Sequence, residues 1–221
     1  SNQLDANIIL TPNKVQSLST DLEGTYSAGY WGLGGNINYG HRNIFRGSET
    51  LSLRGRAAYE YQGKDQNAYE LGGDIGLKFP TFLLPFATRD IKRNVRATTE
   101  INGSYSYRNR PKEYTGIVTG IGFKYNWSEQ FEVKHNVDVL NISYVYYPFI
   151  SPEYRAYLST SPYFVYNFQN HLIMRTGYSG SYSSFRPLQP LRNYSTLNYG
   201  IETAGNLLYG MNNLLNSKKD T

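Results

Sequence analysis

The side chains of this 221-residue chain that are capable of chemistry are few and widely separated. The histidines His41, His135 and His171 do not have the spacing of a zinc-binding HExxH motif. The chain has no cysteine, which excludes disulfide frameworks, zinc ribbons and cysteine nucleophiles within it. Gly32–Gly35 lacks the strand–loop–helix setting of a nucleotide-binding loop, and no nucleophile elbow or paired-carboxylate motif occurs. We therefore expect a protein that is not an enzyme, with no catalytic, cofactor-binding or metal-binding residues.

Composition favours a β-rich protein over a helical membrane protein. The hydrophobic fraction is 39% and the mean hydropathy is −0.54. No run approaches the roughly 18 apolar residues that a transmembrane helix needs. With 22 tyrosines and 10 phenylalanines, the chain is too aromatic to be disordered at this polarity. The net charge of +5 comes from scattered Lys and Arg without a nucleic-acid-binding motif, so we expect no nucleic-acid partner.

The elements that position these side chains are predicted to be β-strands, because polar and apolar residues alternate along most of the chain. The alternating stretches are 17–26, 31–40, 51–61, 69–79, 97–107, 117–127, 137–147, 172–182 and 197–205, the last three being less regular. Most approach the ten or so residues with which a tilted strand crosses a bilayer. Turn residues at 46–48, 62–64, 109–111 and 187–190 separate strands, and Ser151–Leu158 is compatible with a short helix.

Two features of the alternation favour an antiparallel transmembrane β-barrel over a soluble β-sandwich. One strand face carries many charged residues and glycines, which suits a water-filled lumen. The other face is apolar and has aromatic residues such as Trp31, Tyr59 and Trp127 near the strand ends. Membrane barrels place aromatic girdles there, whereas the rings of a sandwich more often lie mid-strand. The predicted fold class is therefore all-β, and the chain supplies about nine strands of a transmembrane barrel.

The stretch 32–47, GLGGNINYGHRNIFRG, and the following ETLSLRGRAAYEYQ resemble the opening strands of the outer-membrane assembly-factor superfamily. This superfamily includes BamA and TamA and is also called the bacterial surface antigen family. In it a Gly-rich strand leads into a periplasmic turn of the type Asn-aromatic-Gly, which Asn43, Phe45 and Gly47 match. Further matches are Thr11–Gln16, Leu22–Thr25, Lys78–Pro80, Trp127 before His135, and Glu202–Asn206.

The resemblance implies that this chain is the N-terminal half of a larger barrel of about 16 strands. The start of the chain, Ser1–Asn7, does not read as a signal peptide, and its last ten residues do not read as a closing strand. We therefore expect residues 1–14 to be the junction from absent periplasmic POTRA-like domains and residues 15–211 to be the barrel half. Residues 212–221 are expected to form a loop toward the missing remainder.

The same resemblance implies a non-enzymatic role in outer-membrane protein assembly in a Gram-negative bacterium. The first strand of the family templates a client strand at a lateral seam, by β-augmentation. The matching strand is Gln16–Ser27, with Gln16, Ser17, Ser19, Asp21 and Glu23 as the expected gate residues. The implied partners are outer-membrane lipids, nascent β-barrel clients and accessory lipoproteins or envelope subunits. Open alternatives are a passive outer-membrane channel or two-partner secretion pore, and a soluble sandwich or lectin.

Overall fold

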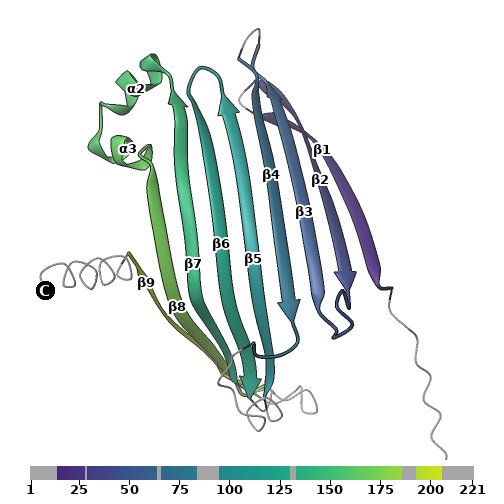
Figure 1. Ribbon diagram of the computed structural model, residues 1–221. Coiled ribbons are helices and arrows are strands. Elements are labelled where there is room, and N and C mark those ends of the chain that lie inside the picture. Colours follow the sequence, from purple (N-terminus) through teal and green to yellow (C-terminus); the bar gives the residue numbers. More distant parts are fainter. Residues whose placement is uncertain are drawn as a thin grey trace, which may run out of the picture.

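Nine strands form one antiparallel sheet in which the spatial order follows the chain order (Figure 1). A computed structural model describes residues 14–27, 29–63, 66–83, 95–129, 133–185 and 193–205. The strands are β1 (Gln16–Ser27), β2 (Tyr30–Arg42), β3 (Thr50–Tyr61), β4 (Ala68–Phe79), β5 (Arg96–Arg110), β6 (Tyr114–Glu129), β7 (Val133–Ile150), β8 (His171–Ser183) and β9 (Thr196–Ala204). The all-β antiparallel prediction and the nine strands are confirmed. The sheet itself is open and is not closed into a barrel.

Some expected segments lie outside the described residues. These are the loop 212–221, the turn at 187–190 and all but the last residue of the junction 1–14. The predicted turn at 109–111 is placed differently, because β5 continues through Arg110 and the turn follows it. The less regular alternation of the seventh strand also has a cause: the β7–β8 register shifts between Asp138 and Asn141, which exchanges the faces of odd and even residues.

Two short helices, α2 (Pro152–Leu158) and α3 (Pro162–Asn167), connect β7 to β8. The expected helix at 151–158 is confirmed, with Ser151 as its N-cap: the Ser151 hydroxyl accepts a hydrogen bond from the Tyr154 N–H at 3.1 Å. The sequence pattern did not predict α3. No helix among the described residues is long and apolar enough to cross a membrane.

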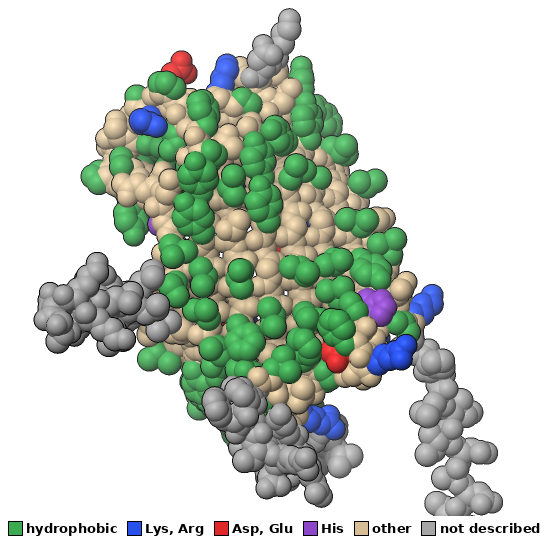
Figure 2. Space-filling model, viewed as in Figure 1, with side chains coloured by type: hydrophobic (Ala, Val, Ile, Leu, Met, Phe, Trp, Pro, Cys, Tyr) green, Lys and Arg blue, Asp and Glu red, His purple; other side chains and the backbone are tan. Residues whose placement is uncertain are grey.

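Strand register keeps most apolar residues of the nine strands on one face of the sheet, although Val118 and its partner Val145 lie on the other. One row crosses six strands through directly paired residues, namely Leu53, Ile75, Gly103, Ile121, Ile142 and Met174. Figure 2 shows hydrophobic side chains spread over this face, with the charged side chains near its rim. Many of these apolar residues are exposed: Leu22 is 85% exposed, Trp31 68% and Ile121 65%.

The opposite face carries most of the charged residues, and ion pairs between neighbouring strands join many of them. Five ion pairs link adjacent strands: Arg56–Asp74, Lys78–Glu100, Glu70–Arg108, Lys124–Asp138 and Arg175–Glu202. Glycines and small polar residues lie between them. A Cβ added to Gly76 or Gly120 would come within 2.6 or 2.7 Å of the neighbouring Ser52 or Ser104 hydroxyl. The absence of a side chain at these glycines therefore lets the neighbouring serine lie close to the backbone.

A buried core exists at only one place on the described sheet. Phe82, which follows β4, packs on the apolar face against Tyr125 and Trp127, with ring centroids 5.7 and 5.9 Å apart. The fully buried Thr99 holds this segment: its hydroxyl donates to the Thr81 carbonyl at 2.8 Å and accepts from the Leu83 N–H at 3.0 Å. No second sheet covers either face in the described ranges.

Candidate functional site: the free edge of strand β1 and the adjoining turn

Strand β1 forms one edge of the sheet and pairs only with β2 among the described residues. The four expected gate residues Ser17, Ser19, Asp21 and Glu23 share the charged face, because they alternate with Leu18 and Leu22. The fifth, Gln16, lies opposite His41 and belongs to the other face. The structure therefore brings four of the five residues together in one row, as expected from their spacing, and separates Gln16 from them.

The hydrogen-bond pattern fixes which backbone groups of β1 point away from β2. The Arg42 N–H donates to the Val15 carbonyl at 2.7 Å, so these two residues form a hydrogen-bonded pair. Hydrogen-bonded pairs recur at every second residue in an antiparallel ladder. The odd-numbered residues of β1, including Ser19 and Asp21, therefore bond to β2. The even-numbered residues, including Thr20 and Leu22, direct their N–H and C=O groups to the free edge.

This edge has little of the usual protection against a further strand. It is 12 residues long, and its register against β2 is unbroken. Edge strands are commonly shielded by Pro, by Lys, by a bulge or by short length. β1 contains neither Pro nor Lys, and its Leu18 and Leu22 are exposed. Only Asp21 and Glu23 carry charge on this strand. The edge is therefore a ready template for an antiparallel strand.

The expected turn residues Asn43, Phe45 and Gly47 lie in the connection between β2 and β3. Asn43, Arg46 and Ser48 have φ values of 65°, 67° and 68°, a left-handed conformation that Asn tolerates better than most residues. The Asn43 side-chain oxygen accepts a hydrogen bond from the Ser48 N–H at 2.9 Å. Phe45 is 63% exposed at the tip. A side chain at Gly47 would collide with the Glu49 carboxylate, so another residue there would displace this flexible side chain.

Sequence reasoning missed Glu49, whose carboxylate organises this turn. It accepts hydrogen bonds from the Gly47 N–H at 2.9 Å and the Phe45 N–H at 3.3 Å. These contacts lower the pKa of the Glu49 carboxyl. The backbone N–H of Glu49 itself makes the largest contribution, and the Gly47 and Phe45 N–H groups add to it, while desolvation partly opposes the effect. No local pattern identifies such a residue, because a Glu beside a strand is ordinary in sequence.

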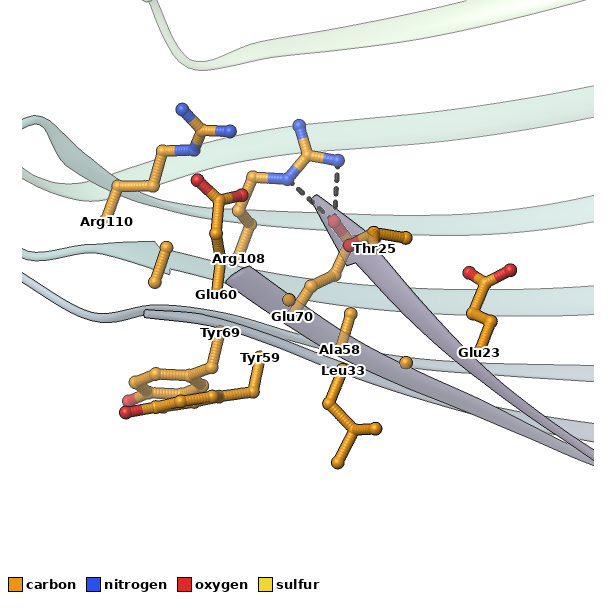
Figure 3. A pocket seen from close by; sticks show the side chains of 13 residues that line it. Glu23, Thr25, Leu33, Ala58, Tyr59, Glu60, Tyr69, Glu70, Arg108 and Arg110 are labelled. Atoms are coloured by element: carbon orange, nitrogen blue, oxygen red, sulfur yellow. Dashed lines mark hydrogen bonds and ion pairs between the residues drawn. The ribbon is translucent and has the colours of Figure 1, made fainter. Parts of the chain in front are cut away.

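A shallow cavity of about 120 Å³ lies on the charged face near the end of β1. Its charged lining includes Glu23, Glu60, Glu70, Arg108 and Arg110. In Figure 3 these side chains stand on one side of the strands, while Tyr59, Tyr69 and Leu33 point to the other. Arg108 contacts Glu70 through two nitrogens, at 2.7 and 2.9 Å. Sequence spacing does not reveal that these residues meet, because they come from four strands.

The histidines lie on three different strands, β2, β7 and β8. His135 stacks on Trp127 with ring centroids 4.7 Å apart, and its Nδ1 lies 2.8 Å from the Tyr178 hydroxyl. Over the described ranges, no group of three or more His, Cys, Asp or Glu residues is arranged to hold a metal ion. Comparison with family models, curated proteins and solved structures gives no match for this chain.

Proposed function

We propose that this chain is part of an outer-membrane β-barrel that assembles other β-barrel proteins without catalysis. In this proposal the apolar face contacts lipid, the charged face lines a water-filled lumen, and the β1 edge receives the strands of clients. The observation that carries it is the apolar face, which is continuous over nine strands and exposed in a single-layer sheet. A water-soluble sandwich would bury such a face against a second sheet.

The height of the apolar face agrees with a bilayer. On β4 the face runs from Tyr69 to Phe79, both aromatic, with Leu71, Ile75 and Leu77 between them. Those ten residue steps extend roughly 33 Å along the strand at about 3.3 Å per residue. At the tilt of roughly 35–45° found in membrane barrels, this span is about 25 Å high, which equals the apolar band of such barrels.

The direction of the edge strands supports a larger barrel. In an antiparallel sheet that follows chain order, the first and ninth strands run in the same direction. β1 and β9 therefore cannot join each other as an antiparallel pair. An odd number of further strands is required for antiparallel closure, which gives the even total typical of bacterial barrels. The β1 edge is then one side of a seam whose other side lies outside these nine strands.

The passive pore remains the second candidate, because the ion pairs of the charged face suit a water-filled lumen in either protein. The two functions differ in what the seam must do. An assembly factor has to open the seam to present the β1 edge, whereas a pore conducts ions through a barrel that stays closed.

A locked seam separates the two candidates. In the locked variant, Ser19→Cys in β1 is joined by a disulfide to a cysteine in the closing strand of the intact protein. The quantity measured is the rate at which a client barrel inserts into membranes. A matched control joins Ser106→Cys to Val118→Cys, which are register partners within the sheet. We expect the locked seam to stop insertion and the control to leave it unchanged. Insertion at the wild-type rate through a fully locked seam would contradict the proposed function and favour the pore.

A further inference from the structure

We propose that the free edge of β1 selects an antiparallel strand with lysine or arginine opposite Asp21 and Glu23, on the charged face of the sheet. This inference rests on the proposed function and names the chemistry of the strand that the edge receives. Backbone pairing alone accepts any extended segment, whereas charged side chains beside the edge make the pairing selective.

The charged face follows a charge rule at five places, where an acidic residue forms an ion pair with a basic residue of the adjacent strand. Glu60 is an exception, because its carboxylate accepts a hydrogen bond from the Gln62 side chain. In three of the five pairs the partners are directly opposite in the register, namely Lys78–Glu100, Glu70–Arg108 and Lys124–Asp138. In the other two, Arg56–Asp74 and Arg175–Glu202, the partners are diagonal neighbours. Opposite charges on directly facing strand positions stabilise a sheet, and like charges destabilise it.

Asp21 and Glu23 lack such a partner among the described residues. Their register partners on β2 are Asn36 and Gly34. From residue 32 to residue 40 the charged face of β2 carries only Gly and Asn. Arg42 is on that face too, but it lies six residues beyond Asn36, roughly 20 Å away along the strand.

The next strand offers no free cation to these two acids either. On β3, Arg54 donates a hydrogen bond to the Asn38 side chain at 2.8 Å, and Arg56 pairs with Asp74. Figure 3 shows Glu23 standing apart from the Arg108–Glu70 pair. A basic partner on an adjacent strand must therefore come from the free side of β1.

The geometry of the free side favours such a contact. Asp21 forms its backbone hydrogen bonds with β2, so on the other side it occupies a non-hydrogen-bonded position. The Cα atoms at these positions approach to about 4.5 Å, compared with about 5.5 Å in hydrogen-bonded pairs. Side chains of an incoming strand would therefore lie close to the carboxylates of Asp21 and Glu23.

The same charges argue against two other occupants of the edge. The charged face of β9 carries Glu202 and no basic residue, so a β9 strand of a second copy would add an acid. A second β1 strand would bring Asp21 and Glu23 toward the same two acids. Neither supplies the missing cation, and both introduce like charges. The occupant is therefore a strand of different sequence that carries basic residues two positions apart.

Peptide capture tests this inference. The probes are peptides of about ten residues with alternating valine and threonine. Every peptide has one cysteine on its polar face. Three versions differ only in two further positions of that face, which are both lysine, both glutamate or both glutamine. They would be disulfide-linked to the Ser19→Cys variant of the intact protein in detergent micelles. We expect the lysine peptide to be captured on the order of tenfold more than the glutamate peptide, and this excess should shrink at about 1 M salt.

Charge variants provide the controls. Adding Asp21→Lys and Glu23→Lys should reverse the preference, and the milder Asp21→Asn with Glu23→Gln should abolish it. Asn102→Lys, on the charged face of β5 and flanked by Gly76 and Gly122, should leave the preference unchanged. Equal capture of the lysine and glutamate peptides would overturn the charge rule.

Two further outcomes separate this inference from the proposed function. If the charge variants assemble clients normally while the locked seam still blocks assembly, the charge rule fails and the proposed function stands. If the Ser19→Cys variant captures no peptide although its new thiol reacts with a small thiol reagent, both are overturned.

Discussion

Replacement of Ile75 by arginine distinguishes a lipid-facing surface from one that faces water. Ile75 lies in the middle of β4, is 52% exposed and belongs to the apolar row that crosses six strands. An arginine on the lipid face near the bilayer midplane costs about 2–4 kcal/mol. We therefore expect Ile75→Arg to lower the free energy of unfolding of the intact protein in lipid bilayers by this amount, measured by urea titration.

Two control variants separate the effect of position in the bilayer from the effects of exposure and of a lost ion pair. Tyr61 is 54% exposed on the same face but lies at the end of β3, where the cost of arginine falls to about 0–1 kcal/mol. Asp74→Asn breaks only the exposed 3.5 Å pair with Arg56, which is worth about 0–1 kcal/mol. Because Ile75 and Tyr61 are almost equally exposed, an aqueous environment predicts similar effects for both. Equal costs for Ile75→Arg and Tyr61→Arg would therefore refute the assignment of this face to lipid.

Three further predictions concern the edge, the turn and the segment after β4. Thr20→Pro removes an N–H that points to the free edge, so client insertion should fall while the fold persists. Asp21→Pro instead removes a backbone hydrogen bond to β2, so circular dichroism should show a loss of strand content. The lowered pKa of Glu49 means that its carboxylate stabilises the turn fully above its ordinary value of 4.5, and this contribution is lost as the pH falls through the lower folded value. The measured quantity is the protection of the Gly47 amide from hydrogen exchange, given as the ratio of the wild-type value to the value in Glu49→Gln. This ratio should be greatest above pH 4.5 and fall to one at lower pH. A ratio that does not change with pH would contradict the role of Glu49. Thr99→Val removes both hydrogen bonds to the segment Thr81–Leu83, at a cost on the order of 1–2 kcal/mol, and faster exchange of the Leu83 amide would report it.

The strands were predictable because a strand with one polar and one apolar face has polar and apolar residues in alternation along its sequence. In β4, Leu71, Ile75 and Leu77 alternate with Glu70, Asp74 and Lys78, and this pattern needs no knowledge of the neighbours. The pattern becomes less clear in β7, where the register shift after Asp138 changes which residues face outward. A change of phase of this kind depends on the partner strand and is not visible in the local sequence.

Features that depend on distant contacts were not predictable. α3 has only six residues and no side-chain N-cap bond at Ser161. Phe168, at its end, packs instead against Tyr114, Tyr147 and Tyr154, with ring centroids 5.0, 5.1 and 5.4 Å away. The candidate site likewise has features that the sequence predicted and features that it did not. The alternation of β1 follows from spacing, and the turn residues Asn43, Phe45 and Gly47 come from the family resemblance. The direction of the free backbone groups follows only from the register with β2.

Depth-resolved fluorescence quenching tests most directly whether this face contacts lipid. Trp31 and Trp127 lie on the apolar face at opposite ends of the strands, and Ile121 lies between them, 65% exposed. Variants of the intact protein with a single tryptophan, either native or introduced by Ile121→Trp, would be reconstituted in bilayers whose acyl chains carry bromine at defined depths. We predict that the tryptophan introduced at position 121 is quenched most by bromine near the bilayer centre, and that Trp31 and Trp127 are quenched most by bromine near the headgroups. Absence of quenching at position 121 by bromine at any depth would contradict the account.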